Sequence, residues 1–128
     1  SPKVERAFLK VPREEFLKKV AMSKILIHPS FYEAAPLVLI EAALLRVPVI
    51  THKAPYSEEF VESLGIGKTI NVENIHKFAD AIVSIANDED LIYRVMQSHE
   101  RLQKLFDING TVKKYLALYQ SLSNTTKR

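Results

Sequence analysis

The sequence predicts an α/β domain of three layers, in which a parallel sheet of about four strands lies between helices and a helical C-terminal segment follows. Two observations support this prediction. Short apolar runs alternate with segments of helical spacing along most of the chain, which is the pattern of βαβ units in a parallel sheet. Residues 25–27 are apolar without alternation, as in a strand that is buried on both faces. The 128 residues, 47% of them hydrophobic, suffice for one domain with a core.

Each expected element has a local signal. A first strand ends at Pro12, and the helix that follows has two glutamates in its first turn, where the helix dipole favours negative charge. Pro36 opens a second helix, since proline is favoured at the first helical position, and this helix is apolar nearly all round, so we expect it to be buried. Asn109-Gly110 is expected to separate the last two helices. In order, we expect strands at residues 8–11, 25–27, 47–51 and 68–72, and helices at residues 12–22, 36–45, 57–63, 74–86, 88–106 and 111–122.

Composition and charge limit the classes of function. The net charge is +3 and the basic residues are scattered, so we expect no nucleic-acid partner. The absence of cysteine excludes disulfides and thiolate chemistry and fits a cytoplasmic protein. The longest apolar stretch, residues 34–45, is too short to span a bilayer. We take residues 1–122 as the domain and expect residues 123–128 to fray.

Three loops are candidates for a binding site, because parallel sheets bind ligands beyond the carboxyl ends of their strands. They are residues 28–36, residues 51–57 and the segment after Val72. Glu33 lies in the first loop and Glu41 lies in the helix after it. The start of this helix offers backbone N–H groups and a positive dipole end to a diphosphate, and the two carboxylates could accept hydrogen bonds from sugar and ribose hydroxyls.

Several side chains allow a second interpretation. Glu41 stands among apolar neighbours, where a carboxylate needs a partner or a polar cleft, so a salt bridge or a solvent-facing stripe explains it as well as a ligand contact does. His28 could line the cleft, but the four histidines do not suggest a metal site, and we expect no metal or other cofactor. Ser30 lacks the setting of a hydrolase nucleophile.

One pattern of residues resembles the retaining GT-B glycosyltransferases of family 4 (glycosyl transferases group 1), whose motif is Pro-Ser, a short gap, Glu, seven residues, Glu-Ala and then Gly-x-Pro-Val-Ile. The matching positions are Pro29-Ser30, Glu33, Glu41-Ala42 and Pro48-Val49-Ile50. The resemblance implies the Rossmann-like C-terminal, donor-binding domain of a GT-B fold. It implies transfer of a sugar from a UDP- or GDP-sugar with retention, once this domain is joined to an N-terminal acceptor domain that the sequence lacks.

The resemblance also implies a role for single residues. Glu33 would be the catalytic residue, in contact with the donor sugar near its reacting centre, and Glu41 would bind the ribose hydroxyls. Backbone N–H groups near residues 35–38 would hold the diphosphate. The implied donor site comprises Ser30, Glu33, Ala34, Ala35, Pro36, Leu37, Val38 and Glu41.

Three departures from the motif leave a second function open. The family has glycine after the first Glu, before x-Pro-Val-Ile and in the loop that corresponds to residues 51–57. This sequence has Ala34-Ala35-Pro36, Arg46 and Pro55-Tyr56 at these places. The alternative is a non-catalytic GT-B-like binding or interaction module, and in either case we expect the isolated chain to be inactive in transfer. Lys113 and Lys114 make the last helix basic, so a peripheral membrane contact is a further expectation, although a packing helix explains them better.

Overall fold

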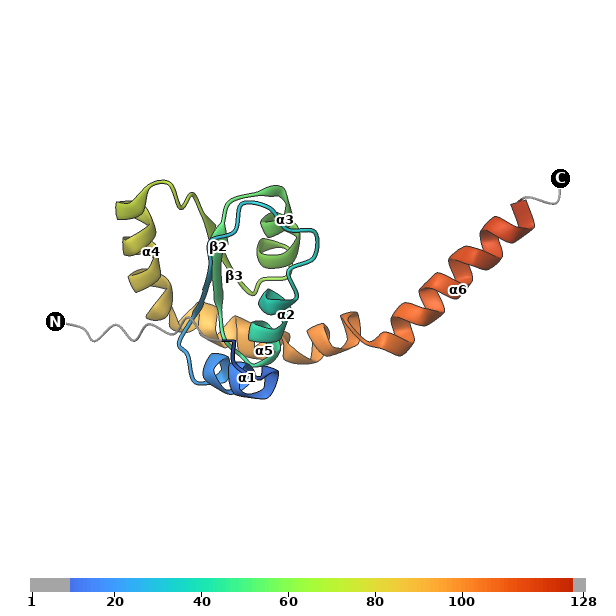
Figure 1. Ribbon diagram of the computed structural model, residues 1–128, viewed down its shortest axis with the longest axis horizontal. Helices are drawn as coiled ribbons and strands as arrows, with labels where there is room; N and C mark the ends of the chain where they lie inside the picture. Colours follow the sequence, from blue (N-terminus) through green and yellow to red (C-terminus); the bar gives the residue numbers. More distant parts are fainter. Residues whose placement is uncertain (1–9, 126–128) are drawn as a thin grey trace.

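The computed structural model describes residues 10–125, and its described strands form one parallel sheet in the order β1-β2-β3 (Figure 1). The strands are β1 (Leu26–His28), β2 (Val49–His52) and β3 (Gly67–Ile70). Residues 8 and 9 of the expected first strand lie outside the described residues, and residues 10 and 11 belong to no strand. The described sheet therefore has three strands, where about four were expected, and the α/β class is confirmed.

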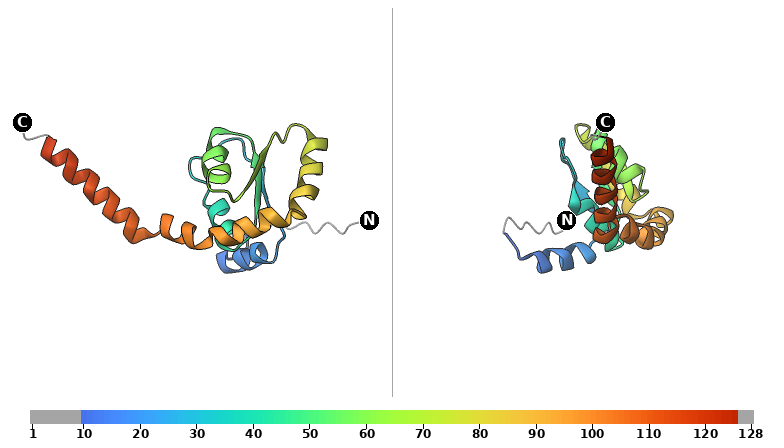
Figure 2. Two further views of the ribbon diagram at one scale, coloured as in Figure 1. Left: turned by 180° about the vertical axis from the view of Figure 1, so that it is seen from behind. Right: turned by 90° about the vertical axis from the view of Figure 1, so that its right-hand side faces the viewer.

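Helices cover both faces of the sheet, which gives the three layers that the sequence predicts (Figures 1 and 2). On one face lies α4, and on the other lie α2 and α3 with the π-helical turn η1. The last helix, α6, extends away from the rest of the molecule. The helices are α1 (Arg13–Ala21), α2 (Leu37–Leu44), α3 (Pro55–Ser57), η1 (Glu58–Glu62), α4 (Ile75–Ala86), α5 (Glu89–Leu105) and α6 (Ile108–Thr125).

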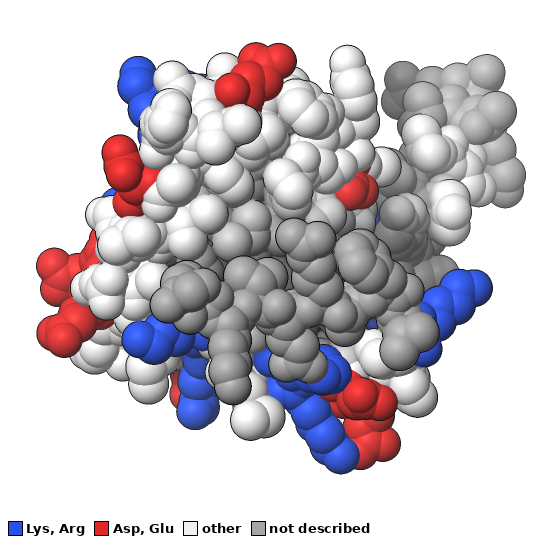
Figure 3. All heavy atoms as spheres, turned by 60° about the vertical axis from the view of Figure 1, so that its left-hand side comes forward, with Lys and Arg blue, Asp and Glu red and all other residues white. Residues whose placement is uncertain are grey.

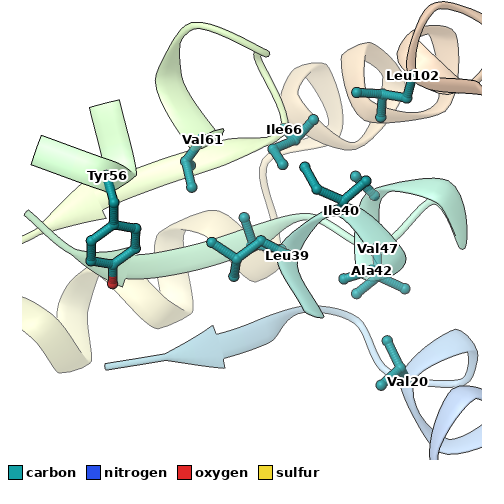
Figure 4. Packing of buried hydrophobic residues seen from close by; sticks show 11 residues of the cluster. Val20, Leu39, Ile40, Ala42, Val47, Tyr56, Val61, Ile66 and Leu102 are labelled. Carbon is teal, nitrogen blue, oxygen red and sulfur yellow. The ribbon is translucent and has the colours of Figure 1, made fainter. Parts of the chain in front are cut away.

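The core consists of two clusters, one on each face of the sheet. Successive residues of a strand point to opposite faces, so Val49 packs into one cluster and Ile50 into the other. Both are fully buried, as expected of a central strand. Ile27, by contrast, is 41% exposed, so the prediction that residues 25–27 are buried on both faces was wrong for β1, which is an edge strand in the described sheet. The cluster under α2 includes Leu39, Ile40, Ala42, Val61, Ile66 and Leu102 (Figure 4).

The end of α2 has a left-handed residue that is not glycine. Arg46 has φ 64°, and its N–H donates to the carbonyl of Ala43 at 2.9 Å. The N–H of Val47 donates to the carbonyl of Ala42 at 2.8 Å. These two bonds form a Schellman motif, in which the left-handed position is usually glycine. Arg46 therefore takes the position at which a Schellman cap normally has glycine, and the cap leads the chain directly into β2.

The boundary between the last two helices lies earlier than expected. Asn109-Gly110 lies inside α6, and the break between the helices falls at Phe106 and Asp107. The Asp107 carboxylate accepts a hydrogen bond from the N–H of Gly110 at 2.7 Å and so caps the start of α6. The predicted break was wrong by about one turn. Helix α6 then continues to Thr125, which includes the first residues of the expected frayed tail.

Charged side chains are mixed on the visible surface. On the face shown in Figure 3, basic side chains of the described residues lie beside acidic ones and do not form a continuous basic area. None of the helices among residues 10–125 is long and apolar enough to cross a membrane.

Candidate functional site

The carboxyl ends of β1 and β2 lie side by side and place the first two candidate loops at one edge of the sheet. His28 pairs with Thr51 in the parallel register, so His28 and His52 end neighbouring strands. The loop after β1 leads to the start of α2, and the loop after β2 leads to α3. This arrangement is the one that the sequence predicts for a ligand site.

Glu33 is held by the last residue of β1. Its Oε1 lies 3.0 Å from Nε2 of His28, and the two side chains are 31% and 23% exposed. The loop therefore folds back over the end of its own strand. One carboxylate oxygen is oriented by the imidazole, and the side chain remains accessible to solvent.

Tyr56 connects the two loops. Its ring is buried with 7% of its surface exposed, and its hydroxyl donates a hydrogen bond to the carbonyl of Ser30 at 2.6 Å. Burial, and secondly the negative charge of Glu33, raise the pKa of the Tyr56 hydroxyl above its usual value of 10.0. The hydroxyl therefore stays protonated and remains a donor at neutral pH.

A second contact between the loops involves aromatic rings. The rings of Phe31 and His52 lie with their centroids 4.3 Å apart at an angle of 44°. His52 also accepts a long hydrogen bond of 3.4 Å at Nδ1 from the N–H of Val72, just beyond β3. The hydroxyl of Ser30 donates to the carbonyl of Tyr32 at 3.1 Å and stiffens the loop from within. The loop that contains Glu33 is thus fixed at several points.

The start of α2 follows this loop directly. Pro36 is the N-cap residue, so the helix begins at Leu37, one residue later than the sequence predicts. Pro36 is buried. Leu37 is 66% exposed, Val38 is half-buried, and Ala34 and Ala35 are exposed. In the described part of the chain no side chain caps this helix end. Its first N–H groups therefore present the positive end of the helix dipole at the same edge of the sheet.

Glu41 lies apart from the contacts around Glu33. Its Oε1 pairs with Nη2 of Arg13 at 2.6 Å, and the side chains are 19% and 69% exposed. Arg13 is the first residue of α1, so this ion pair joins α1 to α2. The salt bridge that was one interpretation of Glu41 in the sequence is present. No residue signal near Glu41 pointed to Arg13, which lies 28 positions earlier.

The described residues contain no group of three or more side chains that could hold a metal ion. Of the four histidines, His28 and His52 belong to the contacts at the strand ends. Tyr56 stood out in the sequence only as a departure from glycine, and neither its hydrogen bond nor the pairing of Phe31 with His52 was predicted.

Comparisons with known proteins identify the family. The family model described as glycosyl transferases group 1 matches residues 6–104, which run from before α1 to nearly the end of α5. No curated protein matches the chain, and no solved structure matches it. The matched region contains all three described strands and both candidate glutamates, and the fold is consistent with a Rossmann-like GT-B C-terminal domain. The chain therefore belongs to the glycosyl transferases of group 1.

Proposed function

We propose that this chain is the donor-binding part of a retaining GT-B glycosyltransferase of family 4 and binds a UDP- or GDP-sugar. The supporting observation is the loop–helix unit after β1, because it presents Glu33, the open end of α2 and then Glu41 in sequence order. Membership of a glycosyltransferase family makes a nucleotide-sugar donor the expected ligand class.

Each part of the unit has a proposed role. Glu33 contacts the donor sugar near its reacting centre and is the proposed catalytic residue. The N–H groups of Ala35, Leu37 and Val38 hold the diphosphate, Ser30 also contacts the donor, and Glu41 accepts hydrogen bonds from the ribose hydroxyls. The helix end stabilises the charge that develops on the departing nucleotide, since donors and dipoles that are already oriented need no reorganisation during the reaction. The proposal includes no metal or cofactor.

The ion pair between Glu41 and Arg13 favours a second candidate function. A carboxylate that already has a cationic partner at 2.6 Å is less available to ribose hydroxyls. Ala34-Ala35-Pro36 also replaces the glycine that the family motif has after Glu33. The second candidate is a GT-B-like module that binds a partner protein without catalysing transfer.

Nucleotide titration separates the two functions. The chain is labelled with ¹⁵N and titrated with UDP and with GDP, and amide shifts at residues 33–41 are followed. If it is a donor domain, at least one nucleotide shifts these amides, and Glu41→Gln weakens binding by about tenfold, because hydrogen bonds to a charged group contribute about 1.5–3 kcal/mol. Glu100→Gln, on the exposed surface of α5, is the matched control.

The variant Glu33→Gln tests the assignment of the sugar contact. It should leave the affinity for UDP or GDP unchanged and lower the affinity for the corresponding sugar nucleotide. If neither nucleotide shifts residues 33–41 at millimolar concentration, the donor-domain proposal is rejected in favour of the interaction module. Transfer itself requires an N-terminal acceptor domain in the proposal. The cytoplasmic location and the membrane contact of α6 remain predictions from the sequence.

A further inference from the structure

Tyr56 occupies a place where the family motif has glycine, and its side chain has a definite structural use. The ring packs with Leu39 and Val61 in the core cluster under α2, and its hydroxyl points out of this cluster toward the side of β1 (Figure 4). There it donates to the carbonyl of Ser30 at 2.6 Å. Glycine at this position would leave the space of the ring empty and would remove the donor to the Ser30 carbonyl.

The bond to Ser30 acts on the segment that carries Glu33. Residues 30–33 are attached at one end by Tyr56 and at the other by His28, which contacts Glu33 at 3.0 Å. Between these points the Phe31 ring lies against His52. The position of Glu33 is therefore set by three contacts, one of which comes from β2 and one from α3. A side chain must be held to within a fraction of an ångström to present a reacting group correctly.

We propose that Tyr56 is a positioning residue for Glu33, because its hydroxyl fixes the loop that presents the Glu33 carboxylate to the donor sugar. This inference rests on the proposed function, in which Glu33 contacts the sugar. It goes further in assigning the geometry of that contact to a side chain that the family motif lacks. His28 orients one oxygen of the carboxylate, and Tyr56 sets the backbone from which the carboxylate projects.

A conservative pair of variants tests the proposal. Tyr56→Phe removes the hydroxyl and keeps the ring in the core. Tyr93→Phe removes the hydroxyl of a tyrosine that is 63% exposed on α5 and serves as the control. The wild-type chain and both variants are titrated by calorimetry with UDP, GDP, UDP-glucose and GDP-mannose. The affinity gained by adding the sugar to the nucleotide is the quantity compared.

We expect Tyr56→Phe to leave the affinity for the bare nucleotide unchanged and to lower the ratio of sugar-nucleotide to nucleotide affinity by about fivefold, the factor that one neutral hydrogen bond contributes. Tyr93→Phe should change neither quantity. The proposal is overturned if the ratio is unchanged in Tyr56→Phe. It is also overturned if both affinities fall together, because a general loss of folding would act on the whole site.

A measurement without ligand separates this proposal from the proposed function. In the free protein, ¹⁵N relaxation should show residues 30–33 as rigid as β1 in the wild-type chain and more mobile in Tyr56→Phe. If the wild-type chain binds none of the four ligands, the donor function fails and the sugar-positioning role fails with it. The relaxation data then still decide whether Tyr56 fixes the loop, and unchanged mobility in Tyr56→Phe would refute even that part.

Discussion

Replacing Arg46 with glycine should stabilise the protein. Arg46 is the non-glycine residue with positive φ among residues 10–125, and its φ of 64° lies in the left-handed region. An L-residue pays about 1–2 kcal/mol there, because its Cβ approaches the following carbonyl oxygen. Glycine avoids this cost but loses about 0.5–1 kcal/mol more backbone entropy on folding. The difference predicts a gain of about 0.5–1 kcal/mol for Arg46→Gly.

Loss of the arginine side chain should subtract little from this gain. Arg46 is exposed, and the two hydrogen bonds of the Schellman motif use backbone groups that glycine also has. Arg46→Ala is the control, because it removes the side chain but retains the Cβ and hence the strain. Comparing Arg46→Gly with Arg46→Ala therefore isolates the backbone effect.

Thermal unfolding followed by circular dichroism or calorimetry measures the effect. For a domain of this size, about 0.5–1 kcal/mol corresponds to a rise in Tm of about 2–4 °C. Gly65 also has positive φ, 69°, and an added Cβ would meet only Arg101 at 4.0 Å. By the same balance of strain and backbone entropy, Gly65→Ala should lose about 0.5–1 kcal/mol. If Arg46→Gly and Arg46→Ala have the same Tm, strain at Arg46 is not a significant term and the reasoning is refuted.

Two further predictions concern stability. Gly67→Ala should lower the free energy of unfolding by at least about 3 kcal/mol, the upper part of the range for overpacking, because the added Cβ would lie 1.9 Å from the carbonyl oxygen of Val49. Urea unfolding measures this loss. A smaller loss would mean that β2 and β3 can move apart at little energetic cost. Asp88 caps α5 by accepting a hydrogen bond from the N–H of Leu91. This bond, and secondly the contact with Lys68, lowers the pKa of the Asp88 carboxyl below its usual value of 3.8. The folded state thus favours the charged form, so the stability from Asp88 is present above about pH 4 and is lost as the pH falls through the folded-state pKa. Asp88→Asn should flatten this acid dependence in melts from pH 6 to pH 2, and an unchanged dependence would exclude the cap as its source.

Local patterns predicted most of the fold. The strands and helices between residues 12 and 106 lie within a few residues of their expected positions, because each has a period or a terminal signal that acts over one or two turns. The exposure of Ile27 was not predictable in this way, since it depends on which strand lies at the edge of the sheet. The start of α6 was misplaced because the side chain of Asp107 is a stronger signal there than Asn109-Gly110.

The candidate site was predictable where its contacts are local. The loop after β1 and the open start of α2 follow from sequence order and the strand-end rule. Tyr56 and Ser30 are 26 positions apart, and their hydrogen bond depends on the pairing of β1 with β2. A local sequence pattern does not show which distant loops will lie side by side. The contact by which Tyr56 of α3 fixes the loop of Glu33 is therefore visible only in the folded structure.

The ion pair between Arg13 and Glu41 does not by itself prevent ribose binding. Arg13 is 69% exposed, and exposed pairs contribute about 0.2–1 kcal/mol, whereas a hydrogen bond to a charged carboxylate contributes about 1.5–3 kcal/mol. Two ribose hydroxyls would therefore displace the guanidinium. Arg13→Ala should raise the affinity for the nucleotide that binds by no more than about fivefold, as measured by calorimetry, because only the pair energy is recovered. A gain well above tenfold would mean that Arg13 is a real barrier at Glu41, and a loss would mean that Arg13 itself contacts the nucleotide.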